Sequence, residues 1–178
     1  MKKILIWEAV GALFIIIAGI LLHSAYEQSG GLPLLAPFGP VNESVWEHLK
    51  IGIWPATFFA VIEYYFIGKK AKNFVAAKVA CIYLIPAIIL AIYNNYTCVL
   101  GYNVLILDIL TFIAAVIIGQ AISCYILVSP EGDPIWKYLG AITWIVILIG
   151  IVWVTYYPPH LPVFRDPMSG VYGIPFRE

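Results

Sequence analysis

The sequence predicts an all-α integral membrane protein that folds as a bundle of five transmembrane helices. Hydrophobic residues make up 62% of the 178-residue chain and charged residues only 11%, whereas soluble domains are about 45–50% apolar and about 25% charged. So few charges cannot cover the surface of a soluble protein, and so apolar a chain is not disordered. Five separate runs also reach the roughly 20 apolar residues that a helix needs to cross a bilayer.

The predicted spans follow one another along a single transmembrane domain that covers residues 1–178. The first span begins with a basic segment, but its apolar run is too long for a signal peptide, so we expect it to remain as a helix. The spans lie near residues 4–22, 49–67, 76–93, 103–128 and 138–157, with an outer loop at 23–48 and an outer tail at 158–178.

The uneven distribution of lysine and arginine predicts the orientation. Cytoplasmic loops carry an excess of these residues, and a cytoplasmic N-terminus places seven of them inside and three outside. The inner ones are Lys2, Lys3, Lys69, Lys70, Lys72, Lys78 and Lys137, and the outer ones are Lys50, Arg165 and Arg177. The sequence therefore predicts a multi-pass protein of the cell membrane with its N-terminus inside and its C-terminus outside.

The outer loop and the outer tail share an unusual composition. Both are rich in glycine and proline, which prevents a long helix, yet both are too apolar for a flexible solvated linker. We therefore expect the two segments to pack on the outer ends of the helices as a cap.

Histidine and carboxylate side chains gather at the outer boundary of the predicted spans. All three histidines lie there, and neutral histidine with carboxylate is the ligand set of zinc and similar ions. The same groups serve general acid–base catalysis, so the sequence leaves both chemistries open. The candidate metal ligands are His23, Glu43, His48 and His160, and the candidate catalytic groups are His23, Glu43, His48 and Asp108.

Asp108 is expected inside the membrane. At 1.5 Å per residue it lies about 8 Å below the outer end of its predicted span. An ionised carboxylate there costs roughly 2.5–3.5 kcal/mol unless it faces a partner. We expect that partner to be His23, His48 or Lys50, either in a pocket where Asp108 orients a histidine or in a purely structural pair.

Two acidic residues near the histidines favour structural roles. Ser44 and Glu47 fit a capping box, in which both side chains satisfy free N–H groups at the start of a helix. Glu27 lies one helical turn after His23, on the same face of the first predicted helix.

The tail and the inner side hold two further polar sets with structural or gating roles. Arg165 and Asp166 precede a proline, which is ordinary turn chemistry, and Arg165 can also clamp the outer loop. On the inner side, Glu8, Glu63 and Lys78 lie one to two turns inside their spans. They fit a buried ion-pair cluster or the inner mouth of a permeation path.

These observations favour an outward-facing pocket of histidine, glutamate and aspartate that acts at the membrane surface, by binding a divalent metal such as zinc or by hydrolysing a substrate. A channel or carrier for a small ion or solute, and a structural or partner-binding subunit, are the alternatives. No short catalytic signature decides between them. The expected partners are the lipid bilayer and a small molecule, lipid headgroup or ion, and zero net charge gives no reason to expect nucleic acid.

Two strings carry a resemblance to a known family. The run Pro40-Val41-Asn42-Glu43-Ser44-Val45-Trp46-Glu47-His48-Leu49-Lys50 and the closing pattern from Pro158 to Gly173 resemble a family of small bacterial integral membrane proteins, known as a domain of unknown function. The resemblance covers nearly the whole chain. It implies a bacterial membrane protein and supplies no reaction.

Overall fold

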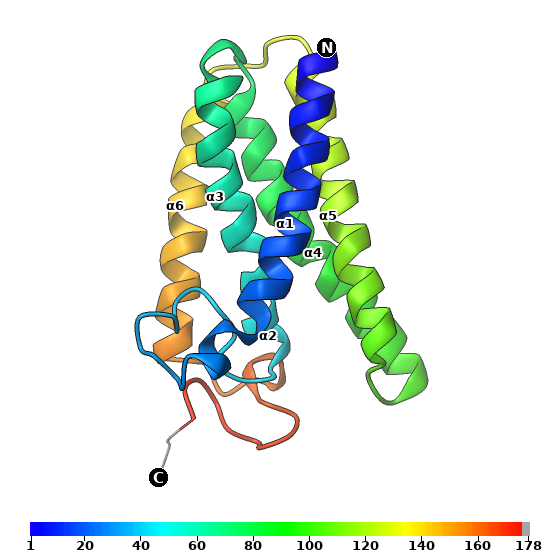
Figure 1. Ribbon diagram of the computed structural model, residues 1–178, viewed down its shortest axis with the longest axis vertical. Helices are drawn as coiled ribbons and strands as arrows, with labels where there is room; N and C mark the ends of the chain where they lie inside the picture. The colour runs from blue at the N-terminus through cyan, green and yellow to red at the C-terminus, as the bar shows by residue number, and fades with distance from the viewer. Residues whose placement is uncertain (176–178) are drawn as a thin grey trace.

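The computed structural model describes residues 1–175 and is built from helices (Figure 1). Residues 176–178, which include Arg177 of the predicted outer tail, lie outside the described residues. The described part holds an isolated bridge between Arg165 and Tyr172 but no strand. The elements are α1 (Lys2–Gln28), α2 (Val45–His48), α3 (Lys50–Phe66), η1 (Gly68–Lys70), α4 (Phe74–Leu100), α5 (Leu105–Val128), α6 (Ile135–Tyr156) and η2 (Pro162–Phe164).

Four of these helices are long and apolar enough to cross a membrane. They are α1, α4, α5 and α6, with 27, 27, 24 and 22 residues, which contain nearly all of four predicted spans. The predicted span 49–67 corresponds to α3, which has 17 residues and is about 26 Å long. The all-α class is therefore confirmed, and the chain is compatible with a multi-pass membrane protein.

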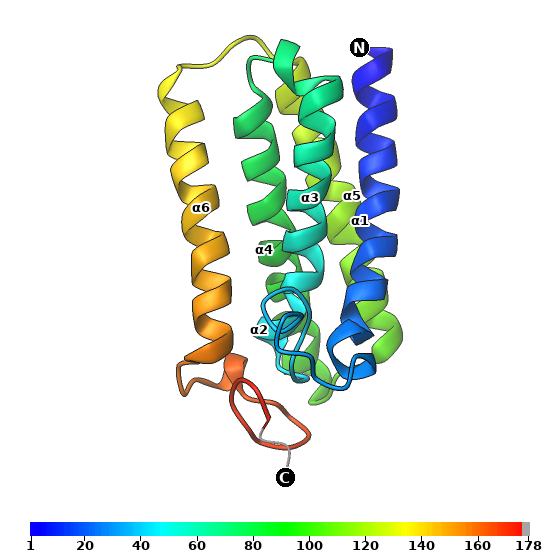
Figure 2. The same cartoon turned by 60° about the vertical axis from the view of Figure 1, so that its left-hand side comes forward.

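The helices pack around an apolar centre. The helix α4 contacts α3, α5 and α6, while α1 contacts α3 and α5, and Figure 2 shows α1 and α6 on opposite sides of the molecule. Ile15, Ile53, Ile85 and Val116 meet in the core with at most 1% of their surface exposed. The outward faces of the long helices are also apolar, which is costly in water and favourable in lipid.

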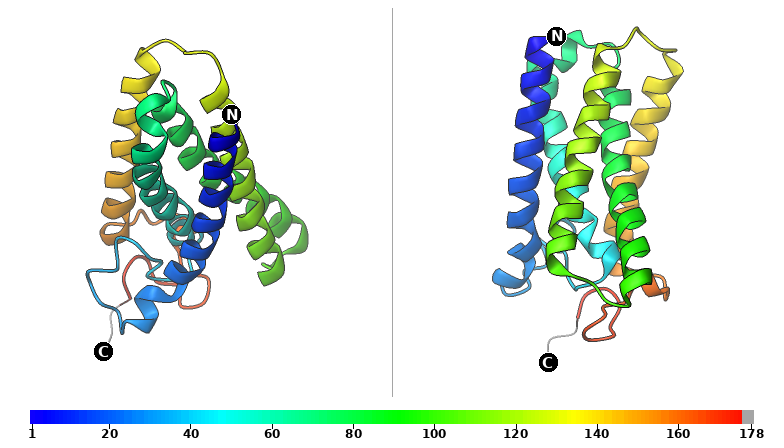
Figure 3. Two further views of the ribbon diagram at one scale, coloured as in Figure 1. Left: turned by 45° about the horizontal axis from the view of Figure 1, so that its top comes forward. Right: turned by 90° about the vertical axis from the view of Figure 1, so that its right-hand side faces the viewer.

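The two ends of the helices differ in charge. The basic end holds the chain start and the α3–α4 and α5–α6 connections (Figure 1), with Lys2, Lys3, Lys69, Lys70, Lys72 and Lys137. The histidine end carries the loop 29–44 and the tail 157–175, with His23, His48 and His160. At this end α4 and α5 diverge from α1 and turn back at residues 101–104 (Figures 1 and 3).

Candidate metal centre

Three of the predicted ligands meet at the histidine end. The Nε2 atoms of His23 and His48 lie 3.0 Å apart, and Oε2 of Glu43 lies 3.4 Å from Nε2 of His48. One ligand atom from each of the three residues lies within 4.8 Å of the other two. His23 comes from α1, Glu43 from the loop before α2 and His48 from the last position of α2. Folding therefore brings His23 next to two residues that lie 20 or more positions away in the sequence.

A contact with a backbone carbonyl determines which ring nitrogen of His48 carries the proton. Its Nδ1 lies 2.9 Å from the carbonyl oxygen of Ser44, and a carbonyl can only accept, so Nδ1 carries the proton. In neutral His48, Nε2 then holds a lone pair that points towards His23 and Glu43. This hydrogen bond is the outer support that metal-binding histidines commonly have.

The separations suit a tetrahedral ion. With bonds of about 2.0–2.1 Å, two ligand atoms on a tetrahedral zinc lie about 3.3 Å apart. Two separations from Nε2 of His48, 3.0 Å to His23 and 3.4 Å to Glu43, fall on either side of this value. All three ligand atoms lie within 4.8 Å of one another, so the cluster would have to close by up to about 1.5 Å between His23 and Glu43 to hold a zinc-sized ion.

The charges of the cluster support one another. Burial opposes the charged form of His48, but the carboxylate of Glu43 and the Ser44 carbonyl outweigh it and raise the pKa of His48. A hydrogen bond from charged His48 in turn lowers the pKa of Glu43, against the effect of burial. Burial and the nearby His48 lower the pKa of His23, so a proton in this cluster is held by His48 rather than by His23.

The start of α2 orients Glu43 and His48. The hydroxyl of Ser44 accepts a hydrogen bond from the Glu47 N–H at 3.4 Å, which is one half of the predicted capping box. The other half is replaced, because Asn42 Oδ1 accepts the Ser44 N–H at 2.9 Å. The Glu47 carboxylate instead accepts the N–H of Val41 at 3.0 Å.

A buried lysine fixes the loop 29–44 to the start of α3. The ammonium of Lys50 contacts Oε2 of Glu47 at 2.5 Å and donates to the carbonyls of Ala36 at 2.9 Å and Gly39 at 3.3 Å. Lys50 is 0% exposed. It is therefore a structural residue of the loop, and the predicted contact with Asp108 is replaced by these three.

The tail docks onto the same loop. Asp166 accepts the N–H groups of Met168 at 2.7 Å and Ser169 at 3.1 Å, and that of Glu43 at 3.4 Å. Burial would raise the pKa of Asp166, but these N–H groups and the Ser169 side chain lower it. The amide of Asn42 donates to the carbonyl of Gly173 at 2.7 Å. The loop and the tail thus pack together over the helix ends, as expected for a cap.

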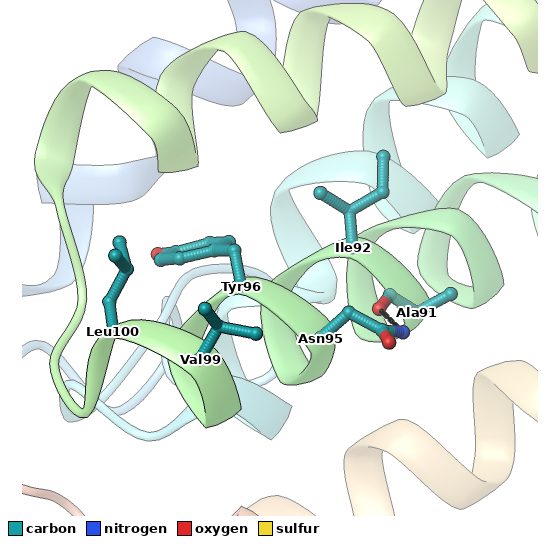
Figure 4. Close-up of a pocket in the computed structure, with 6 residues that line it drawn as sticks. All are labelled: Ala91, Ile92, Asn95, Tyr96, Val99 and Leu100. Atoms are coloured by element: carbon teal, nitrogen blue, oxygen red, sulfur yellow. Dashed lines mark hydrogen bonds between the residues drawn. The ribbon is translucent and has the colours of Figure 1, made fainter.

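Asp108 lies outside the cluster, because the α4–α5 hairpin diverges from α1 (Figure 1). Its carboxylate accepts a hydrogen bond from the Tyr96 hydroxyl and one from Asn103 at 3.4 Å. Tyr96 also borders a shallow apolar pocket along α4 (Figure 4). Asp108 therefore pairs with none of the expected partners His23, His48 and Lys50, neither to orient a histidine nor as a structural pair.

The remaining outer residues are also separate from the cluster. His160 stacks on Tyr172, with ring centroids 4.7 Å apart, and does not belong to the metal-ligand group found among residues 1–175. Arg165 donates to the carbonyl of Gly170 at 3.3 Å within the tail turn, in place of a clamp on the loop. Glu27 is exposed near the end of α1.

The inner residues Glu8, Glu63 and Lys78 form the predicted ion-pair cluster near the basic end. The Lys78 ammonium lies 2.5 Å from Glu8 Oε1 and 2.6 Å from Glu63 Oε2. The centre of the bundle separates this cluster from the histidine end, since the buried side chains between them include Ile15 and Ile85.

Fold and site together define a helical protein compatible with several membrane crossings, with a histidine–glutamate cluster at one end. The family model described as "Family of unknown function (DUF6512)" matches residues 1–174, and the chain belongs to this family. Membership of a family of unknown function is thus confirmed, while a bacterial origin stays a prediction. Comparison with curated proteins and with solved structures gave no match.

Proposed function

We propose that this protein binds a divalent transition metal ion such as zinc through His23, Glu43 and His48, at the outer surface of the cell membrane. The observation that carries the proposal is the pair of Nε2 atoms 3.0 Å apart, with a carboxylate oxygen 3.4 Å from one of them. Two imidazoles and a carboxylate are the ligands of several catalytic zinc sites.

Three protein ligands leave a fourth position on a tetrahedral ion. In catalytic zinc sites that position takes water or substrate, and the ion makes the water acidic enough to act as a nucleophile near neutral pH. We therefore propose a hydrolytic centre for a substrate with a phosphate or carbonyl group, either a lipid headgroup or a small molecule. The half-buried position of His48 and the exposure of Glu43 support access from the aqueous side.

The membrane arrangement is part of the proposal. The helices α1, α3, α4, α5 and α6 span the bilayer as one domain, with the basic end in the cytoplasm and the histidine end outside. The excess of lysine at the basic end supports this orientation. In a cysteine-free background, Ser169→Cys is expected to react with an impermeant thiol reagent from outside, and Lys70→Cys only from the cytoplasm. Reaction of Ser169→Cys only from the cytoplasm would reverse the orientation.

Metal binding is tested by thermal unfolding of the purified protein in detergent. Zinc at about 100 times its dissociation constant is expected to stabilise the fold by about 2.7 kcal/mol. The melting temperature then rises at about pH 7.5 and much less at about pH 5.5, because protons compete for the imidazole nitrogens.

Matched variants separate the cluster from general effects of zinc. His48→Ala is expected to remove most of the rise in melting temperature, and His160→Ala, at the same end but outside the cluster, to leave it intact. Equal effects of the two variants, or no shift with any divalent ion and no metal in the purified protein, would exclude the metal centre.

A further inference from the structure

We infer that Glu8, Glu63 and Lys78 form a proton-binding site inside the membrane, in which the two carboxyl groups hold one proton that exchanges with the solution at the basic end. The site is separate from the metal centre and does not depend on it. Its three residues come from α1, α3 and α4, and Ser123 of α5 completes it.

The ammonium of Lys78 uses all its hydrogens within the site. It approaches Glu8 Oε1 at 2.5 Å and Glu63 Oε2 at 2.6 Å, and donates to the Ser123 hydroxyl at 3.0 Å. The Ser123 hydroxyl donates to the same oxygen of Glu8 at 3.0 Å. Lysine has three N–H donors and serine has one, so these groups have no further hydrogen to offer.

Carboxylate oxygens remain unsatisfied after these contacts. Among the described residues, Glu8 Oε2 and Glu63 Oε1 have no hydrogen-bond partner although both atoms are buried, and the contact of Glu63 Oε2 is the ion pair with Lys78. Glu63 as a whole is 0% exposed and Glu8 is 4% exposed. Both carboxylates contact the same ammonium, at 2.5 Å and 2.6 Å, so the two acidic groups lie close together. A hydrogen bond between two carboxyl groups requires a proton on one of them.

The net charge of the site also favours a bound proton. Two carboxylates and one ammonium carry a net charge of −1, and a net charge buried in a bundle is far more costly than a neutral pair. Two carboxyl groups that share one site resolve this repulsion when one of them keeps a proton. A proton also fits better than a metal cation, since the ammonium already occupies the space between the carboxylates.

The other groups around the site do not neutralise it. On α4 and α5 the neighbours are Cys81, Gln120 and Cys124, and the Cys81 thiol donates to Gln120 Oε1 at 3.8 Å. Within residues 1–175, the ion pairs of the site are the two that Lys78 forms. The surplus negative charge therefore stays with the two glutamates.

The proton enters the proposed route at a pocket at the basic end, which ends one helical turn short of the site. This pocket has a volume of about 410 Å³, and its lining includes Ile4, Ile67 and Leu127, which lie four residues, or one helical turn, from Glu8, Glu63 and Ser123. Water occupies about 30 Å³ per molecule, so the pocket has room for several. On the other side, the apolar core separates the site from the histidine end.

Infrared spectroscopy of the full-length protein in lipid nanodiscs tests the inference. At neutral pH, the wild type is expected to show the C=O stretch of a protonated carboxyl group. Glu8→Gln and Glu63→Gln are each expected to abolish that band, because either change leaves one carboxylate opposite one ammonium. Glu131→Gln, at an exposed ion pair, is the control and keeps the band.

The wild type alone can overturn the inference, even if a variant fails to fold. A wild-type spectrum without a protonated carboxyl band at neutral pH, or a band that persists in both folded glutamine variants, shows that the site holds no proton. Ala71→Trp fills the pocket at the basic end and is expected to slow the shift of the band in D₂O. An unchanged rate of exchange would refute the route through this pocket.

Discussion

Replacing Lys50 by methionine tests whether a buried cation holds the loop 29–44 in place. Methionine keeps a long apolar side chain but removes the ammonium that contacts Glu47 and two backbone carbonyls. The Glu47 carboxylate, only 2% exposed at the residue level, would then retain the Val41 N–H at 3.0 Å but lose its counter-ion.

The structure allows the cost to be estimated. Removing one partner of a buried ion pair leaves an uncompensated charge and costs about 3–5 kcal/mol. The matched control is Lys72→Met, which breaks the Lys72–Glu131 pair of the same 2.5 Å length, with side chains 71% and 50% exposed. An exposed pair contributes about 0–1 kcal/mol, so burial alone should separate the two variants by at least 2 kcal/mol.

The measurement is reversible denaturant unfolding in detergent, with Glu47→Gln added to complete a double-mutant cycle. Neutralising Glu47 in the Lys50→Met background is expected to recover part of the lost stability, because no carboxylate is then stranded. A loss for Lys50→Met no larger than that for Lys72→Met would refute the reasoning. No recovery in the double variant would show that the lost carbonyl contacts, and not the charge, matter.

Two further predictions concern packing and pH. Gly19→Ala places a Cβ 2.7 Å from a backbone oxygen of α3, whereas the Cβ of Gly150→Ala meets nothing within 4 Å. Thermal unfolding should therefore show a loss of stability of about 1–3 kcal/mol for Gly19→Ala and little change or a gain for Gly150→Ala. Equal effects of the two variants would contradict the close approach of α1 and α3 at Gly19. Because the folded pKa of Asp166 is lowered, its stabilisation is present above the ordinary value of about 3.9 and is lost as the pH falls through the folded pKa. Asp166→Asn should therefore destabilise the protein by about 1–3 kcal/mol at neutral pH and much less in acid, and a pH-independent difference would contradict this.

Composition and hydropathy were sufficient to predict the helices. An apolar run of about 20 residues has few alternatives to a helix in a membrane, and the depth of Glu8, Glu63 and Lys78 in their predicted spans indicated the inner ion-pair cluster. Four helices are long and apolar enough to cross a bilayer, and a bundle in which α3 crosses with them stays a prediction. The loop 29–44 could be predicted to pack on the helices, but its contacts depend on backbone carbonyls such as that of Ala36, which no side-chain pattern reveals.

The candidate site was predictable only in part. His48 and Glu43 are five residues apart in one string, and His23 lies near the end of the first predicted span. Only their similar expected depth in the membrane therefore indicated that the three side chains lie close together. Asp108 has the same expected depth, yet it pairs with Tyr96, because the two lie equally far on either side of Tyr102 in the α4–α5 hairpin. The expected depth of a residue thus predicts its position along the membrane normal, but it does not predict which helices the residue faces within the bundle.

The length of α1 has a consequence for how a substrate would reach the histidine end. Its 27 residues extend about 40 Å, which matches a bilayer with its headgroups, about 40–45 Å thick. His23 follows Lys2 by 21 positions (23 − 2), or about 32 Å along the helix. In a bilayer crossed by α1, His23 therefore lies about 8 Å inside the end of the helix at Gln28, near the boundary between the headgroups and the hydrocarbon core of one leaflet. A lipid substrate would reach the cluster by lateral diffusion in two dimensions, with its acyl chains still in the bilayer, whereas a water-soluble substrate would approach the exposed Glu43 from the aqueous side.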